Sequence, residues 1–122
     1  MRFSVVSVSL ALLAAGAAHA APSQSGLRGV VMRGPITPVC VADMPCSEPA
    51  KNVTLVFSRA GHVAGRVVTD SHGLYRIHLP AGVYSVRRAT SRGIDRKLDP
   101  NRVRVLARRF VRADFSIDTG IR

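Results

Sequence analysis

The chain is poor in aromatic residues and in acidic residues, and each shortage limits what it can be. Tryptophan is absent and aromatic residues make up only 5% of the 122 residues, so a core must be built largely from Val, Leu and Ile. Only 7 Asp and Glu residues stand against 18 Lys and Arg residues, which makes the chain strongly basic. The rings that we expect to join the core are Phe57, Tyr75, Tyr84, Phe110 and Phe115.

No catalytic signature is visible. An enzyme is expected to show a nucleophile with its base, a pair of carboxylates or a metal-binding cluster, and none occurs at a recognisable spacing. Asp70, Ser71 and His72 are adjacent in sequence, but neighbours in a tight turn point in different directions. We interpret His72 as a solvated turn residue. The sequence therefore predicts a protein that is not an enzyme and that uses no cofactor or metal.

One long hydrophobic run lies at the N-terminus. Arg2 precedes an apolar stretch that ends at Ala18, and Ala18-His19-Ala20 is a small-x-small cleavage site, a pattern typical of a secretory signal peptide. The alternative, a membrane-anchoring helix, needs about 20 apolar residues, more than this run provides. We expect cleavage after Ala20, a secreted or periplasmic location, and no transmembrane segment in the mature protein.

The length that remains after cleavage suits one domain. We expect residues 1–20 to be the signal peptide, residues 21–26 a flexible leader, and residues 27–122 a single folded domain. No internal repeat divides the folded part.

The chain has two cysteines, Cys40 and Cys46, and both lie in the exported part. An oxidising compartment favours a disulfide between them. The alternative is a soft-metal site that also uses Met44, but structural metal sites usually have four ligands and no histidine lies nearby in sequence.

The folded part predicts an all-β sandwich. Several short segments alternate apolar and polar residues, and clusters of Gly, Pro, Asn, Asp and Ser separate them. Because no segment has a convincing helical pattern, these strands indicate a sandwich of two sheets. Seven strands are predicted, at 27–33, 53–58, 62–69, 74–79, 83–88, 102–107 and 110–117. The two long segments between them, 34–51 and 89–101, are expected to be loops.

The most specific pattern lies at 69–86, TDSHGLYRIHLPAGVYSV. Two alternating runs are joined by Pro80-Ala81-Gly82, while Asp70 can cap the preceding turn and Gly73 can adopt its left-handed position. This pattern resembles the carboxypeptidase regulatory-like domain, one of the prealbumin-like (transthyretin-like) β-sandwich families. Residues 29–35 and 118–122 look like the opening and closing segments of small exported bacterial versions. The resemblance implies a seven-stranded Ig-like or prealbumin-like sandwich that serves in binding or as a structural element.

Two alternatives come from the same group of folds. It includes 5-hydroxyisourate hydrolases, which close with Tyr-Arg-Gly-Ser, whereas residues 118–122 here are Asp-Thr-Gly-Ile-Arg. One alternative function is therefore that of a small transthyretin-like hydrolase with an unrecognised site. A cleft that holds His78 beside an inward-facing carboxylate would favour this alternative. A carbohydrate-binding-like module is the other alternative, but Tyr75 and Tyr84 are predicted to face the core, where they could not stack on a sugar.

Positive charge is concentrated toward the C-terminus. Without Arg2 the chain has 17 Lys and Arg against 7 Asp and Glu, a net charge of +10, and such a field attracts polyanions. The alternative is a merely solvated, arginine-rich surface. If their strands share a sheet, the outward-facing arginines would form a surface for phosphate, sulfate or carboxylate groups. Those arginines are Arg76, Arg87, Arg102, Arg104 and Arg112.

The expected partner is therefore a polyanion of the cell envelope or a protein. Nucleic acid is not expected, because export separates the protein from most nucleic acid and no aromatic residues interleave with the arginines. Alternation alone does not order the strands or give the oligomeric state.

Overall fold

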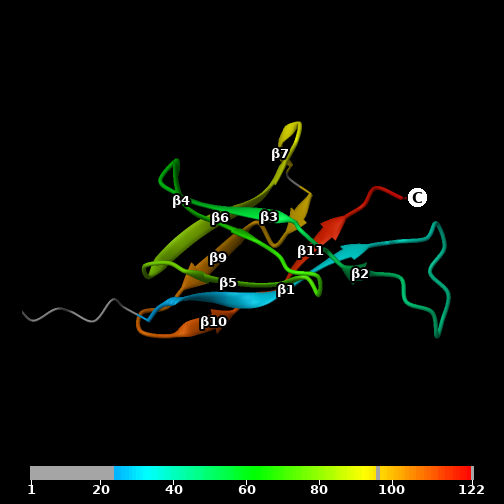
Figure 1. The fold of residues 1–122 in the computed structure, drawn as a ribbon, viewed down its shortest axis with the longest axis horizontal. Helices are drawn as coiled ribbons and strands as arrows, with labels where there is room; N and C mark the ends of the chain where they lie inside the picture. The colour runs from blue at the N-terminus through cyan, green and yellow to red at the C-terminus, as the bar shows by residue number, and fades with distance from the viewer. Residues whose placement is uncertain (1–23, 96, 122) are drawn as a thin grey trace, which may run out of the picture.

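The computed structural model describes residues 24–95 and 97–121. Over these residues the chain forms eleven β-strands and no helix, arranged as two sheets that pack face to face (Figure 1). The predicted all-β sandwich is confirmed. The predicted signal peptide, with its cleavage site, lies outside the described residues. In the described part of the chain, no helix is long and apolar enough to cross a membrane.

The first sheet is built around its central strand, β1 (Gly26–Gly34). One edge of β1 pairs antiparallel with β5 and then with β2, and the other edge pairs parallel with β10 and then with β11. The pairing of β8 with β11 completes this sheet. The partner strands are β2 (Glu48–Pro49), β5 (Leu74–His78), β8 (Leu98–Asp99), β10 (Phe110–Arg112) and β11 (Phe115–Asp118).

The second sheet has the order β4, β3, β6, and the far edge of β6 pairs with β9 near its start and with β7 near its end. All of these pairings are antiparallel. In Figure 1 this sheet lies above the first one, with β3, β4 and β6 over β5, β1 and β10. Its strands are β3 (Thr54–Arg59), β4 (His62–Val68), β6 (Gly82–Thr90), β7 (Gly93–Asp95) and β9 (Arg102–Val105).

The core between the sheets is aliphatic with a small aromatic cluster. Phe57 of the second sheet packs against Tyr75 and Phe115 of the first, with ring centroids 6.3 and 6.4 Å apart. At Gly65 the sheets approach closely, since a Cβ there would lie 2.9 Å from Cδ1 of Ile77. Burial of Phe57, Tyr75, Tyr84 and Phe115 is confirmed. Phe110 is a correction, because its ring lies on the outer face of the first sheet, as described below.

The predicted number of strands is wrong. Six of the seven predicted strands occur with shifted ends, and β2, β7 and β8 lie inside the two segments that were expected to be loops. The seventh, at 110–117, divides into β10 and β11. It divides because Asp114 Oδ1, instead of a backbone carbonyl, accepts the N–H of Val30 at 2.9 Å, which interrupts the backbone ladder along β1.

The β4–β5 turn has the predicted geometry. Asp70 Oδ1 accepts hydrogen bonds from the backbone N–H groups of His72 at 2.8 Å and Leu74 at 2.9 Å. These two donors, Leu74 first, lower the pKa of the Asp70 carboxyl. Gly73 has a φ of +74°, and a Cβ there would lie 2.5 Å from the carbonyl oxygen of Val31. The turn therefore explains the position of the Asp70 carboxylate.

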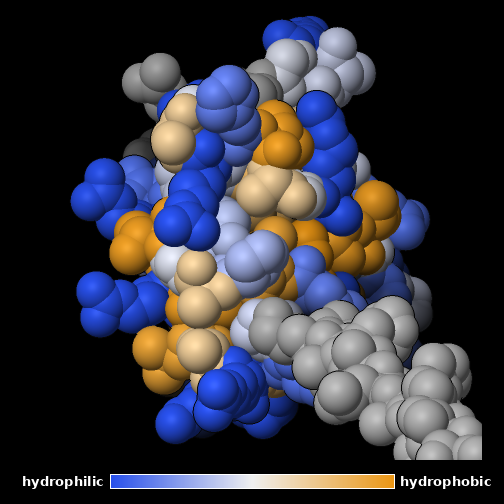
Figure 2. Space-filling model, turned by 90° about the vertical axis from the view of Figure 1, so that its left-hand side faces the viewer, coloured by the Kyte–Doolittle hydropathy of each residue, from blue (hydrophilic) through white to orange (hydrophobic). Residues whose placement is uncertain are grey.

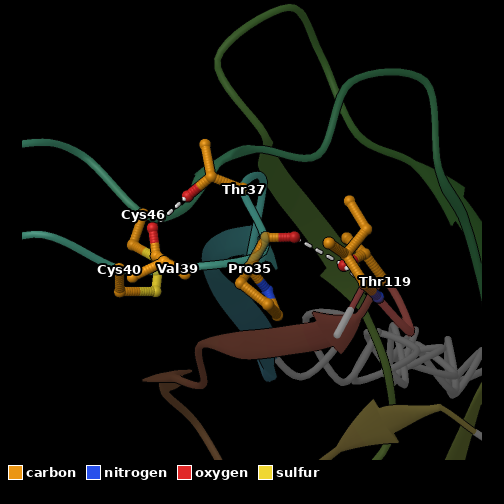
Figure 3. Close-up of a disulfide and its surroundings, with 7 residues drawn as sticks. Pro35, Thr37, Val39, Cys40, Cys46 and Thr119 are labelled. Atoms are coloured by element: carbon orange, nitrogen blue, oxygen red, sulfur yellow. Dashed lines mark hydrogen bonds between the residues drawn. A yellow bond between two sulfur atoms is a disulfide. The ribbon is translucent and has the colours of Figure 1, made fainter.

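The predicted disulfide joins Cys40 and Cys46, whose Cα atoms are 5.4 Å apart. It closes the tip of the segment between β1 and β2, which projects from one end of the sandwich (Figure 1). At the base of this segment Thr119 Oγ1 donates to the carbonyl oxygen of Pro35 at 2.6 Å (Figure 3). The tip exposes the apolar side chains of Val39, Val41 and Met44.

The sandwich includes Ser25 and Gly26, which precede the predicted start of the domain at residue 27. Ser25 is buried and its hydroxyl donates to the carbonyl oxygen of Leu79 at 2.6 Å, and β1 starts at Gly26. The last residues of the expected leader thus pair with the sandwich.

Candidate anion-binding site

The five predicted anion-binding arginines all point outward, but the structure divides them between the two sheets. Arg76 on β5 and Arg112 on β10 belong to the first sheet. Arg87 on β6 and the pair Arg102 and Arg104 on β9 belong to the second. Since the outer faces of a sandwich look in opposite directions, the five cannot form one surface.

On the first sheet, strand register creates an alignment that the sequence did not reveal. Arg28 of β1 is directly opposite Arg76 of β5 on one edge and Arg112 of β10 on the other. All three side chains are exposed, while their neighbour Leu27 points into the core. We call Arg76, Arg28 and Arg112 the arginine row. Directly opposite side chains have Cβ atoms about 4.5–5.5 Å apart, so three guanidinium groups gather on three adjacent strands.

An aromatic ring supports one end of the row. The Arg76 Cζ lies 4.0 Å from the centroid of the Phe110 ring, a cation–π contact. His78 meets the same ring edge-on, with centroids 5.0 Å apart. Gly26 separates these two residues in the register, and a Cβ there would lie 2.6 Å from the Phe110 ring. The missing side chain of Gly26 therefore lets Phe110 lie across β1 and stack beneath Arg76.

A carboxylate fixes the other end. Asp114 Oδ2 lies 3.1 Å from Nε of Arg112, and Asp114 also accepts the Val30 N–H. Through the described residues, Arg28 and Arg76 have no ion pair, so the row keeps most of its positive charge. Directly opposite like charges destabilise a sheet. A bound anion would relieve this repulsion.

Tyr75 anchors the strand break beneath the row. Its hydroxyl donates to the carbonyl oxygen of Ala113 at 2.5 Å, and the Ala113 N–H donates to the carbonyl oxygen of Arg28 at 2.8 Å. Burial of Tyr75, with a smaller contribution from the Asp114 carboxylate, raises the pKa of the phenol above its usual range. Tyr75 is therefore a protonated donor at physiological pH.

A shallow depression of about 260 Å³ lies beside the row. Arg28 and Arg112 line it together with Leu74 and Tyr75, so positive charge borders a partly apolar floor. Viewed end-on in Figure 2, the sandwich presents strongly hydrophilic residues on several sides with hydrophobic residues between them. The arginine row and the depression beside it can hold an anionic group by bidentate guanidinium contacts.

The histidines that could indicate hydrolase chemistry lie exposed on two strands and in one turn. His78 is exposed on the outer face beside Phe110 rather than in a cleft with a carboxylate. His62 lies exposed on β4. His72 lies exposed in the β4–β5 turn, where its Nδ1 is 3.3 Å from the Ser71 hydroxyl, so these two neighbours do not point apart as expected. Across residues 24–95 and 97–121, no three His, Cys, Asp or Glu side chains gather as a metal site would require.

A larger hollow of about 540 Å³ lies at the opposite end, near the start of the disulfide-closed segment. Charges of both signs line it, including Arg33, Lys97, Asp99 and Asp118. Arg33 is paired with Glu48 at 3.4 Å. This mixed lining does not favour an anion as the row does.

Sequence and structure comparisons give little further guidance. No protein-family model and no curated protein sequence matches the chain. Among solved structures, one that resembles it is Klebsiella pneumoniae 5-hydroxyisourate hydrolase. The two are 20% identical, the match covers 78% of this chain and 90% of that chain, and the TM-score is 0.44. At this level of likeness, the description of the sandwich rests on the chain's own strand pairing.

Proposed function

We propose that this protein is an exported, non-enzymatic β-sandwich of the cell envelope that binds an anionic polymer through the arginine row. The observation that carries the proposal is the register of Arg76, Arg28 and Arg112 on three adjacent strands. The proposal includes cleavage after Ala20 and kinship with small exported carboxypeptidase regulatory-like domains. The pattern at 69–86 supports that kinship.

The spacing of the row favours a polymer over a single small ion. Neighbouring strands are about 4.8 Å apart, so the outer two backbones are about 10 Å apart. One phosphate, sulfate or carboxylate group would need all three side chains to converge on it, and two of them are held elsewhere, Arg76 over the Phe110 ring and Arg112 on Asp114. A chain of repeated anionic groups that crosses the strands can contact each arginine in turn.

The disulfide supports a location outside the cytoplasm. Disulfides form and persist in oxidising compartments and are rare where thiols are kept reduced, and Cys40 and Cys46 are paired here. A basic protein in the envelope meets polymers that carry phosphate or carboxylate groups. Its net charge would speed its association with them at low salt.

The proposal is tested by heparin binding to the oxidised mature protein over a series of salt concentrations. A variant with Arg28, Arg76 and Arg112 all changed to Ala should bind heparin at least about tenfold more weakly. The slope of log K against the logarithm of the salt concentration should become less negative by about two to three. The matched control, with Lys51, Arg59 and Arg92 changed to Ala, loses the same charge from exposed positions. Equal losses in the two variants would mean that the charge acts generically.

A second variant separates charge from geometry. Replacing the three row arginines with Lys keeps the charge but removes the planar fork that contacts two oxygens at once. We expect intermediate affinity for heparin. Affinity equal to that of the unchanged protein would rule out bidentate recognition.

The enzymatic alternative has its own test. The purified protein should leave 5-hydroxyisourate to decay at the uncatalysed rate. Acceleration that is lost in His78→Ala would overturn the non-enzymatic part of the proposal while leaving the binding measurement to stand by itself.

A further inference from the structure

The outer face of the second sheet carries its own set of arginines. Register places Arg66 of β4 and Arg87 of β6 on either side of Val56 in β3. Val56 points outward yet is only 1% exposed, which indicates that the flanking side chains cover it with their methylene stems.

A hollow of about 230 Å³ opens on this face between β6 and β9. Val86 lines it together with four polar residues, Arg87, Arg102, Ser85 and Asn101. The Val86 N–H donates to the carbonyl oxygen of Asn101 at 2.8 Å, which holds the two strands together at this point. We call these four residues the arginine hollow.

The donors of the hollow suit a single anionic group. The guanidinium groups of Arg87 and Arg102 and the amide of Asn101 can donate to phosphate, sulfate or carboxylate oxygens. The Ser85 hydroxyl already donates to the carbonyl oxygen of Ser58 at 3.3 Å. No Asp or Glu is among the described residues that line the hollow, so no carboxylate competes there with a ligand. Its volume exceeds the share of several water molecules, at about 30 Å³ each, and therefore admits such a group.

The hollow and the row face away from each other. On β6 the side chains of Tyr84 and Val86 are buried in the core. Successive side chains of a strand point to opposite faces, so Arg87, which follows Val86, points outward. On β1 the buried Leu27 and Val31 likewise place Arg28 on the opposite outer face. Packed sheets are about 10 Å apart, and both sets of guanidinium groups extend beyond them. One anionic group cannot contact both sites.

We infer that the protein holds two anionic chains at once, one on the arginine row and one at the arginine hollow, and thereby links them. The inference rests on the proposed function, since it takes the row as the first site. It adds a second site of the same ligand chemistry on the other sheet. A molecule of this kind would join polymer strands within the envelope instead of coating one of them.

Stoichiometry gives the first test. Titration of the oxidised protein with a heparin oligosaccharide too short to pass around the sandwich should reach two equivalents. The row variant, with Arg28, Arg76 and Arg112 changed to Ala, and the hollow variant, with Arg87 and Arg102 changed to Gln, should each reach one. Gln keeps part of the stem that covers Val56, and a thermal melt shows whether each variant is folded.

Bridging gives the second test. Heparin beads loaded with protein should capture a second, fluorescent heparin chain. Each variant should still load on the beads but should capture at least about tenfold less of the fluorescent chain, because it has only one site. Arg59→Gln with Arg92→Gln is the control for the hollow variant and should capture as the unchanged protein does.

The two hypotheses fail in different ways. A single equivalent that is lost in the row variant, or bridging by the hollow variant that equals that of the unchanged protein, overturns the two-site inference while the row stands. The second of these results would also arise if bridging came from a dimer that uses the row twice. Failure of the unchanged protein to load on the beads overturns the proposed function itself.

Discussion

The two outer faces of the sandwich both present arginines, but they position them by different means. On the first sheet, Phe110 stacks under Arg76 and Asp114 pairs with Arg112, so neighbouring side chains orient the row. On the second, the residues described around the hollow include no ring and no carboxylate, and the hydrogen-bonded pairing of β6 with β9 sets the spacing. The row should therefore respond to single substitutions beside it, whereas the hollow should not.

The largest effect is expected at Gly29, where the strand break behind the row meets β1. A Cβ at Gly29 would lie 2.1 Å from the carbonyl oxygen of Ala113, a backbone atom that cannot simply rotate away. Gly29→Ala should lower the free energy of unfolding by about 4 kcal/mol, measured by urea denaturation. Gly61→Ala is the control, because nothing lies within 4 Å and only its φ of +78° is unfavourable, at about 1–2 kcal/mol. Equal costs would contradict the close approach.

Tyr75→Phe should produce the next largest effect by removing the hydrogen bond to Ala113. We expect a loss of about 1–2 kcal/mol in the free energy of unfolding and weaker heparin binding by the row, with the hollow unchanged. Because the pKa of Tyr75 is raised in the folded state, the unfolded chain ionises first. Its stabilising contribution is full below a pH of about 10 and is lost as the pH rises above that value.

The pH dependence has a direct readout. Urea denaturation between neutral pH and pH 11 should show a steeper alkaline loss of stability for the unchanged protein than for Tyr75→Phe. Parallel curves would mean that ionisation of Tyr75 is not coupled to folding.

Phe110→Leu tests the cation–π contact of the row. An exposed contact of this kind contributes about 0.5–1 kcal/mol, so heparin affinity of the row should fall about two- to fivefold, measured in the hollow variant to isolate one site. The same substitution in the row variant should change nothing. A loss of similar size in both backgrounds would place the effect on the fold instead of on Arg76.

The smallest expected effect concerns Asp114. Asp114→Asn keeps an oxygen to accept the Val30 N–H but removes the charge that pairs with Arg112. Because exposed ion pairs are weak, row affinity should rise only about two- to threefold. Asp43→Asn, an exposed change in the disulfide-closed segment, removes the same charge at a distance and should raise affinity less. An unchanged or weaker affinity in Asp114→Asn would show that Asp114 positions Arg112 for the ligand.

Much of the fold could be predicted because alternation is local. The alternation of Tyr75 with Arg76 and of Ile77 with His78 placed each on its observed face, and the turn at Asp70 and Gly73 followed from residue chemistry alone. The prediction for Phe110 was wrong because it rested on composition. The low number of aromatic residues suggested that Phe110 joins the core, whereas its alternation with Val111 indicates an outward-facing side chain. Val56 also alternates outward, opposite Arg66 and Arg87, yet it is buried, because side chains of the neighbouring strands cover it.

The candidate site could be predicted only in part. Arg76, Arg87, Arg102, Arg104 and Arg112 were identified as outward-facing, but Arg28, the centre of the row, was missed. A signal existed, since Arg28 alternates with the apolar Leu27 in a predicted strand. Its importance depends on two partners, one 48 and the other 84 residues away in the chain, and no local pattern reveals such pairing.

The sequence by itself determined six of the longer strands, the inward or outward face of most of their residues, the turn at 69–74 and the cysteine pair, because each depends on residues that are close along the chain. Only the tertiary structure decided that the arginines form two opposed surfaces and that β10 and β11 share one edge of β1. The physical reason is that strand order and register are fixed by hydrogen bonds and core packing between distant segments, which become neighbours only when the sheets assemble.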